Sequence, residues 1–182
     1  MSYKYLFTSE SVSEGHPDKV ADQISDAILD AHLAIDPNSK VACEVLVTTN
    51  TIIISGEIKS KAKINFEEIA KDVISSIGYT KKEYQFSSET CKITTYIDEQ
   101  SPDINQGVSS DKGLYKEEGA GDQGIMFGYA TNESKTYMPI SLNLSHIILE
   151  ELAELRKNHE LMPYLRPDAK SQVTIEYNDD HS

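Results

Sequence analysis

Over the first hundred residues, the spacing of apolar side chains switches repeatedly between the period of a β-strand and that of an α-helix. Apolar residues alternate over residues 3–7, as in a strand, and recur at helical spacing from Val20 to Ala31. Pro17 suits the first position of that helix, because the backbone N–H that proline lacks would have no intrahelical partner there. The opening residues therefore predict a strand followed by a helix that begins at Pro17.

The same switch occurs a second time. Alternation over residues 41–47 passes through the turn-prone Thr48–Asn50 into a β-branched run that ends near Ile58, which predicts a hairpin. A second amphipathic helix is expected between Asn65, whose side chain can cap the first turn, and Gly78, which can end the last one. Both segments therefore carry their own start and stop signals.

With one more strand predicted at residues 91–97, these elements define an expected fold class. The order over residues 1–99 is strand, helix, two strands, helix, strand, which is typical of a two-layer β-α-β-β-α-β unit. Residues 100–123 are rich in Gly, Ser, Asp and Gln and lack periodicity, so we expect a long flexible loop there. The prediction is an α+β fold whose first unit is followed by this loop.

A second, similar unit is expected over residues 124–182. Residues 125–130 and 172–177 have the pattern of strands, and residues 142–158 have that of a helix. The side chains expected to face inward from this helix are Leu144, Ile148, Leu152 and Leu155. The turn-prone residues 178–180 should lead into a hairpin partner, so we expect an incomplete central unit and a chain that is a truncated portion of a longer protein.

The charge balance limits the partners. The formal net charge at pH 7 is -13 and Lys and Arg form no run, so the counterion release that drives nucleic-acid binding has no source. We therefore expect no nucleic-acid partner. An acidic chain also repels polyphosphates, and a ligand such as ATP would need divalent cations or a few focused basic side chains.

Cysteine usage and apolar content favour a cytoplasmic protein. Cys43 and Cys91 are far apart and lack the paired spacing of a zinc site. The first residues contain no apolar stretch of signal-peptide length, and the chain contains no long apolar run of the kind that spans a bilayer. The expected location is cytoplasmic, and no membrane partner is predicted.

Residues 15–19 stand where a loop turns into the first predicted helix. Free backbone N–H groups and the helix dipole favour anions at such a place. His16 can donate to a phosphate oxygen, and Asp18 can bind Mg²⁺ as a hard oxygen ligand. An equally simple interpretation is that His16 and Asp18 only cap the helix. The pattern by itself does not choose between these two roles.

Three other carboxylates have similarly open interpretations. Glu44 and Glu57 lie on predicted strands and can either bind a ligand or face water. Asp122 lies in Gly119–Gly124, which matches a dinucleotide-binding fingerprint in letters but lacks the preceding strand and the following helix, so we reject that reading. Asp122 is either a local cap or a contact to a substrate ammonium group.

A cationic segment precedes the last predicted strand. Residues 166–171 carry the cations Arg166 and Lys170 and the carboxylate of Asp168. They can clamp the phosphate and ribose of a nucleotide, or they can form an exposed turn whose surface ion pairs contribute little. No HExxH, GxSxG or Walker A pattern occurs, so zinc peptidase, serine hydrolase and P-loop functions have no support.

Four segments together resemble the methionine adenosyltransferase (S-adenosylmethionine synthetase) family. They are residues 7–19 (FTSESVSEGHPDK), 100–107 (QSPDINQG), 119–124 (GAGDQG) and 166–172 (RPDAKSQ). They occur in the family's order, and chains of that family continue well beyond the last of them. Four long motifs in order make chance agreement implausible.

The resemblance implies a role for each candidate residue. The positions implied to contact ATP are His16, Asp168 and Lys170, of which His16 is implied to be catalytic. The implied metal ligands are Asp18 for Mg²⁺ and Glu44 for K⁺. The implied methionine contacts are Glu57, Gln100 and Asp122. The stretch that begins at Gln100 would form a flexible gate over the active site.

The resemblance also implies a reaction and an assembly. The methionine sulfur would attack C5′ of ATP and expel triphosphate, which is then hydrolysed to pyrophosphate and phosphate. A thioether has no proton to lose, so this attack requires no general base. A homodimer or a dimer of dimers with active sites at the subunit boundary is implied, and this chain by itself is expected to be an incomplete catalyst. The alternative is a noncatalytic binding or assembly module of the same ancestry.

Overall fold

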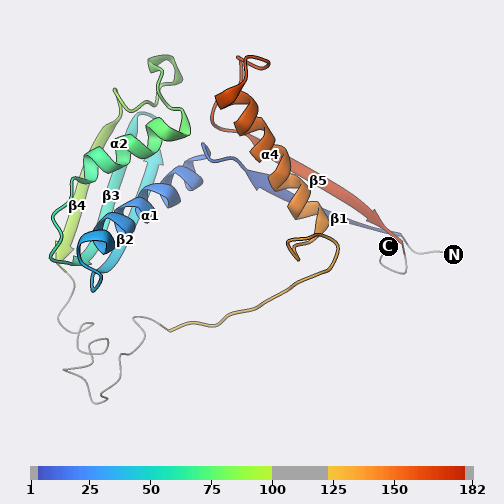
Figure 1. Ribbon diagram of the computed structural model, residues 1–182, viewed down its shortest axis with the longest axis horizontal. Helices are drawn as coiled ribbons and strands as arrows, with labels where there is room; N and C mark the ends of the chain where they lie inside the picture. Colours follow the sequence, from blue (N-terminus) through green and yellow to red (C-terminus); the bar gives the residue numbers. More distant parts are fainter. Residues whose placement is uncertain (1–3, 100–122, 179–182) are drawn as a thin grey trace.

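The computed structural model describes residues 4–99 and 123–178 and contains both helices and strands (Figure 1). In chain order the elements are β1 (Tyr5–Val12), α1 (Pro17–Ile35), β2 (Lys40–Thr48), β3 (Thr51–Lys59), α2 (Phe66–Ile77), the 3₁₀ helix η1 (Lys82–Tyr84), β4 (Lys92–Glu99), α4 (Ile140–Asn158) and β5 (Lys170–Tyr177). The strands of the described residues form two sheets, ordered β2-β3-β4 and β1-β5. The predicted α+β class is confirmed.

Helix α1 begins where the sequence predicts because its first turn is capped. Pro17 occupies the first helical position, and the His16 side chain accepts a hydrogen bond from the backbone N–H of Asp18. Side chains at every fourth position form the buried face of the helix; they are Val20, Ile24, Ile28 and His32. This spacing presents one largely apolar face to the neighbouring sheet.

Strands β2 and β3 form the predicted hairpin with a two-residue turn. Thr48 pairs with Thr51, and Asn50 between them has a φ of 50°, a left-handed conformation that asparagine adopts more readily than most residues. Helix α2 also has the predicted boundaries, because Asn65 caps its first turn and Gly78, with a φ of 110°, ends its last one. This helix crosses from β3 to β4, which pair in parallel.

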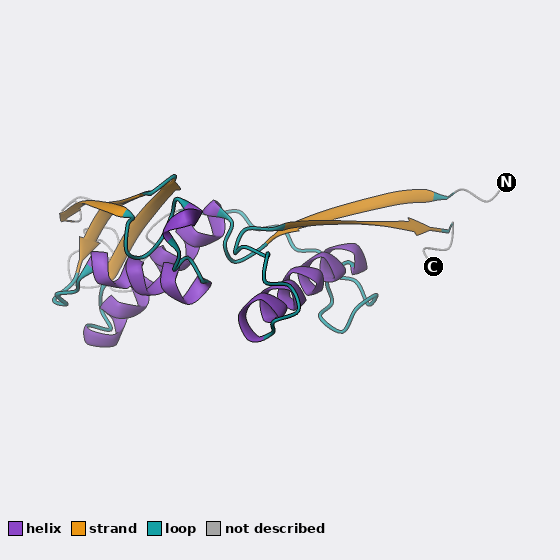
Figure 2. Cartoon of the chain, turned by 90° about the horizontal axis from the view of Figure 1, so that it is seen from above, coloured by secondary structure: helices purple, strands orange, loops and turns teal. Residues whose placement is uncertain are grey.

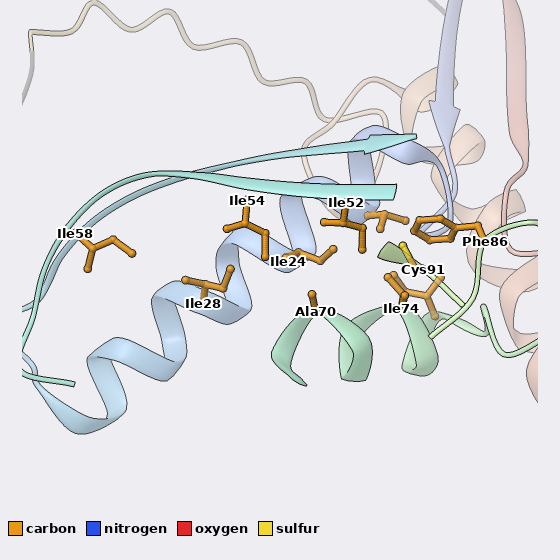
Figure 3. Close-up of a cluster of buried hydrophobic side chains, with 11 residues drawn as sticks. Ile24, Ile28, Ile52, Ile54, Ile58, Ala70, Ile74, Phe86 and Cys91 are labelled. Carbon is orange, nitrogen blue, oxygen red and sulfur yellow. The ribbon is translucent and has the colours of Figure 1, made fainter. Parts of the chain in front are cut away.

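Helices α1 and α2 cover the same face of the β2-β3-β4 sheet (Figures 1 and 2). Ile24 and Ile28 of α1, Ile74 of α2 and Ile52 and Ile54 of β3 are fully buried between the two layers (Figure 3). Complete burial of one such side chain contributes about 1.5–3 kcal/mol. This core holds α1 against the sheet. Neither helix covers the opposite face of the sheet, which we call the open face.

Strand β1 does not complete this sheet, so the predicted β-α-β-β-α-β layer is wrong at its first position. β1 pairs antiparallel with β5 instead, from Tyr5 opposite Tyr177 to Val12 opposite Lys170. Helix α4 packs on this two-stranded ribbon. The ribbon and α4 lie beside the unit formed by α1, α2 and the β2-β3-β4 sheet, which we call the first layer (Figure 1). Alternation identifies a strand, but it carries no information about a partner that lies far away in the sequence.

The predicted strand at residues 125–130 is not formed. These residues are extended without strand pairing, and Ile125 and Phe127 are 83% and 92% exposed. The predicted loop at residues 100–123 lies, apart from Gln123, outside the described residues, so the division of the chain at this loop stays a prediction. Within the two described ranges, no helix combines the length and the apolar composition that crossing a bilayer requires.

The buried face of α4 also differs from the prediction. The helix buries Ser141, Ser145 and Leu149. Of the side chains expected to face inward, Ile148 is 43% exposed, and the other three, Leu144, Leu152 and Leu155, are half-buried. Small serines let the helix lie close to the ribbon, where the Ser141 hydroxyl is 2.8 Å from the hydroxyl of Ser9. Apolar spacing alone does not identify the serines that the helix buries against the ribbon.

Candidate functional site

The buried side chain of Ser13 binds the loop before α1 to the turn before β5. Its Oγ donates to the Pro167 carbonyl at 2.7 Å and accepts from the Ala169 N–H at 2.8 Å. The Ser13 N–H also donates to the Ala169 carbonyl at 2.9 Å. These three bonds bring together residues 15–19 and residues 166–172, which the sequence singled out separately. We call this contact the junction.

Gly15 and Tyr79 pack the junction from the side of the first layer. A Cβ at Gly15 would overlap the backbone of Pro167, so no side chain fits there without a shift of that turn. The Tyr79 hydroxyl donates to the Gly15 carbonyl at 2.6 Å. Burial raises the pKa of Tyr79 to about 12, the Asp168 carboxylate adds to the shift, and Arg156 opposes it. Tyr79 therefore remains a hydrogen-bond donor at neutral pH, with Asp168 nearby.

His16 caps helix α1 through one of its two ring nitrogens. Its side chain is 16% exposed, and its Nδ1 accepts from the Asp18 N–H at 3.2 Å. With Nδ1 as the acceptor, the neutral ring carries its proton on Nε2. The capping interpretation is confirmed for His16. Because capping uses Nδ1 only, it leaves Nε2 as a donor on a residue at the positive end of the α1 dipole, so capping and anion binding are compatible.

Asp18 offers a single exposed carboxylate at this helix end. Its side chain is 88% exposed, and its Oδ2 lies 3.8 Å from His16 Nδ1. Among residues 4–99 and 123–178, no group of three or more His, Cys, Asp or Glu side chains could hold a metal ion. Mg²⁺ usually keeps several waters and takes one or two carboxylates together with substrate phosphates. Asp18 therefore fits a Mg²⁺ ion that is shared with a bound phosphate.

A pocket of about 380 Å³ lies beside the junction. Its lining includes Gly15, Pro17, Thr48, Tyr79, Phe86 and Asp168. Volumes of about 300–1,000 Å³ are typical of small-molecule sites. The pocket is thus bordered by the two neighbours of His16 and by Asp168, which belong to different motifs. Lys170 is exposed at the start of β5, two residues further on.

Arg166 is oriented by an aromatic ring of the first layer. Its guanidinium carbon lies 5.0 Å from the centroid of the Tyr84 ring, a distance typical of a cation–π contact. Tyr84 also lines the pocket. Arg166, for which the sequence left a nucleotide clamp and an exposed turn as alternatives, therefore helps to hold the turn before β5 against Tyr84.

The structure places Glu44 and Glu57 elsewhere. Both are exposed on the open face of the sheet, where Glu44 pairs with Ser55 and Glu57 pairs with Ala42. They therefore face away from the layer of α1, which carries His16. Among the described residues, Glu44 does not belong to a group of three or more His, Cys, Asp or Glu side chains that could hold a metal ion. Gln100 and Asp122 lie outside the described residues.

Sequence reasoning did not single out three residues that build the junction. Ser13 lies within one of the recognised segments, but nothing in its pattern marks its hydroxyl as a link to a distant turn. Tyr79 follows the end of α2, and Arg156 lies in the last turn of α4. Their contacts depend on elements that meet only in the folded chain, so no local pattern identifies them.

Comparison with curated proteins gives close relatives. The chain is 63% identical over 175 residues to the S-adenosylmethionine synthase of Bacteroides thetaiotaomicron, in an alignment that covers 96% of this chain and 40% of that protein. The S-adenosylmethionine synthase of Parabacteroides distasonis is 64% identical over 176 residues, with 96% and 41% covered. That of Cytophaga hutchinsonii is 63% identical over 177 residues, with 97% and 42% covered. The chain spans about two fifths of the length of these relatives.

Two family models match the chain. The model described as S-adenosylmethionine synthetase, N-terminal domain, matches residues 4–102, which is more than half of the chain. The model described as S-adenosylmethionine synthetase, central domain, matches residues 117–182. The junction thus joins a segment matched by the first model to a segment matched by the second. From these matches and the identities above, the chain belongs to the S-adenosylmethionine synthetase family.

Proposed function

We propose that this chain is the N-terminal and central portion of a cytoplasmic methionine adenosyltransferase, which forms S-adenosylmethionine from ATP and L-methionine, and that the junction binds the ATP phosphates. One observation carries this proposal. The hydrogen bonds of Ser13 bring the loop before α1 to the turn before β5, so that the neighbours of His16 and the side chain of Asp168 border the same pocket.

Three residues beside the junction have a task in the proposed reaction. His16 Nε2 donates to a triphosphate oxygen near the bond that breaks, and Asp168 and Lys170 bind the nucleotide. The methionine sulfur forms a bond to C5′, and the C5′–O bond breaks with its electron pair leaving on the triphosphate, which is then hydrolysed to pyrophosphate and phosphate. Because the sulfur has no proton to lose, the residues need only align the reactants and stabilise the leaving oxygen.

The proposed metals have different support in this chain. Asp18 would hold Mg²⁺, and its exposed position in the first turn of α1 supports an ion shared with phosphate. When such a Mg²⁺ ion is bound, it would offset the repulsion between the acidic protein and a polyphosphate. K⁺ at Glu44 follows from the family resemblance alone and would need further ligands from outside the described residues.

The proposed methionine contacts indicate a site that this chain does not complete. We assign them to Glu57, Gln100 and Asp122. Glu57 lies with Glu44 on the open face of the sheet, away from the helices. This separation from His16 supports the expected homodimer or dimer of dimers, in which the open face of one copy would contribute to a site at the boundary with the other.

Nucleotide binding to the chain itself tests the first part of the proposal. Calorimetric titration with ATP and excess Mg²⁺ should show binding, and His16→Ala and Asp168→Asn should each weaken it about tenfold or more, the effect of losing a hydrogen bond to a charged group. Glu67→Gln, on an exposed position of α2, is the control and should not change the Kd. Equal affinity in all three variants would contradict the assignment.

The complete reaction is tested by supplying the missing portion. We expect the chain, mixed with the part of the Bacteroides thetaiotaomicron relative that it does not cover, to release pyrophosphate and phosphate only when both ATP and methionine are present. Assembly with that part but without turnover would favour the alternative, a noncatalytic binding or assembly module.

A further inference from the structure

Glu14, two residues before His16, accepts hydrogen bonds from two consecutive cations in the last turn of α4. Its carboxylate oxygens lie 2.6 Å from Arg156 Nη2 and 2.8 Å from Lys157 Nζ. The Arg156 side chain is 11% exposed and that of Glu14 is 26% exposed. Exposed ion pairs contribute little, whereas shielded pairs with short, charge-assisted bonds contribute more. The Glu14–Arg156 pair therefore has the features of a structural contact.

Arg156 also closes a ring of contacts around the junction. Its Nη1 occupies the space that a Cβ would need at Gly78, the left-handed residue that ends α2. The next residue, Tyr79, donates to the Gly15 carbonyl, and Gly15 directly follows Glu14. The guanidinium thus joins the loop before α1, the end of α2 and its own helix. A planar group with donors at both ends can make these contacts together, and an ammonium group cannot.

The loop before α1 is therefore held at several points, one of which is the side chain of Glu14. Ser13 holds its beginning through backbone groups of Pro167 and Ala169. Tyr79 and Gln23 hold the backbone of the next two residues, through the carbonyls of Gly15 and Glu14. The bonds from Arg156 and Lys157 add a restraint through the Glu14 side chain, just before His16. Groups that orient a binding residue in this way set how much affinity the residue provides.

We infer that Arg156 is a positioning residue. Through Glu14 and Gly78 it fixes the loop that carries His16 relative to the turn that carries Asp168, and it thereby sets the affinity of the junction for a nucleoside triphosphate. This inference rests on the proposed function, because it assumes that the junction binds phosphate. Arg156 acts through Glu14 and need not touch the nucleotide.

Two variants and one control test this inference in the 182-residue chain. Arg156→Gln and Glu14→Gln each remove the charge pair, and each should raise the Kd for ATP with excess Mg²⁺ about tenfold, as when an orienting outer group is removed. Without ATP, the ring signals of His16 and the amide signal of Gly15 should shift in NMR spectra of both variants. Lys71→Gln, which breaks the exposed Lys71–Glu67 pair, should change neither measurement.

The two measurements separate this inference from the proposed function. If the unmodified chain does not bind ATP, the proposed function fails for this chain, and the NMR signals still decide whether Arg156 positions the loop. Unchanged signals in both variants would overturn the inference, as would shifted signals with an unchanged Kd in a chain that binds ATP. Equal losses in Lys71→Gln would also overturn it. Thermal unfolding checks the fold, and if Arg156→Gln does not fold, Glu14→Gln decides.

Discussion

Replacing Ser13 by Ala removes one buried hydroxyl and leaves two backbone groups without that partner. The hydroxyl donates to the Pro167 carbonyl at 2.7 Å and accepts from the Ala169 N–H at 2.8 Å. Ser13 is 6% exposed and Pro167 is buried, so water does not readily replace these bonds. A hydrogen bond contributes about 0.5–1.5 kcal/mol net, and an unsatisfied buried partner costs about 1–3 kcal/mol. We expect Ser13→Ala to lower the free energy of unfolding by about 2–4 kcal/mol.

Urea titration followed by circular dichroism measures this loss. Since the denaturant slope for a chain of this size is about 1–3 kcal/mol per molar urea, the midpoint should fall by roughly 1 M or more. Ser76→Ala is the matched control, because Ser76 donates to the Val73 carbonyl at 2.8 Å on an exposed turn of α2. Water replaces that bond, and alanine is the better helix former. If Ser13→Ala behaved like this control, the buried bonds of the junction would not be what holds it together.

Three further changes test other parts of the fold. Gly15→Ala should lower the free energy of unfolding in urea by about 1–3 kcal/mol, because the new Cβ overlaps the Pro167 backbone, and a loss below about 0.5 kcal/mol would contradict this packing. Asn65→Ala should cost about 1 kcal/mol in the same titration through loss of the α2 cap, and Asn65→Ser should restore most of it. His32→Phe should raise the free energy of unfolding by about 1 kcal/mol at pH 7, because neither ring nitrogen has a hydrogen-bond partner among the described residues. Burial lowers the pKa of His32, so below its ordinary pKa of 6.5 the unfolded chain binds a proton that the folded chain does not. Stability is therefore lost as the pH falls from 6.5 toward the lowered value, and urea titrations at stepped pH should show a smaller loss in His32→Phe; identical pH profiles would contradict the cause.

The helices and the hairpin of the first layer could be predicted because their signals are local. The cap at His16, the proline at position 17 and the pair of Asn65 with the Glu68 N–H each act within one helical turn. The turn at Asn50 is likewise set by two residues between alternating strands. Such features depend on backbone geometry over a few residues, so they survive without knowledge of the fold.

The pairing of β1 could not be predicted from the same signals. Tyr5 and Phe7 alternate as they would in any strand, and nothing near them indicates that Tyr177 and Ile175 lie opposite. Residues 125–130 show the reverse error, because a strand-like pattern has no strand partner among the described residues. Strand pairing is a long-range property, and alternation reports only that a segment is suited to it.

The candidate site, like the fold, could be predicted only in part from the sequence. Family motifs singled out His16 and Asp168 without showing that Asp168 and the two neighbours of His16 border one pocket, which depends on the buried contact of Ser13 with Pro167 and Ala169. The exposure of Glu44 on the open face agrees with the alternation of β2, because the apolar residues of the other parity, Val41, Cys43, Val45 and Val47, pack against the core. Motifs therefore identified residue types, and packing determined which of them can act together.

The N-terminus of α1 explains how a chain with a net charge of -13 could bind a polyphosphate under the proposed function. At physiological ionic strength, exposed charges more than about 8 Å apart are largely screened, so most of the acidic surface acts weakly at the junction. The start of a helix carries about half a positive charge, and His16 Nε2 adds a donor at the same place. The Asp18 carboxylate opposes a phosphate at close range, and a divalent ion bound to Asp18 would reverse that effect. Because recognition of this kind depends on one helix end and a few side chains, an acidic composition argues against a nucleic-acid backbone without arguing against ATP.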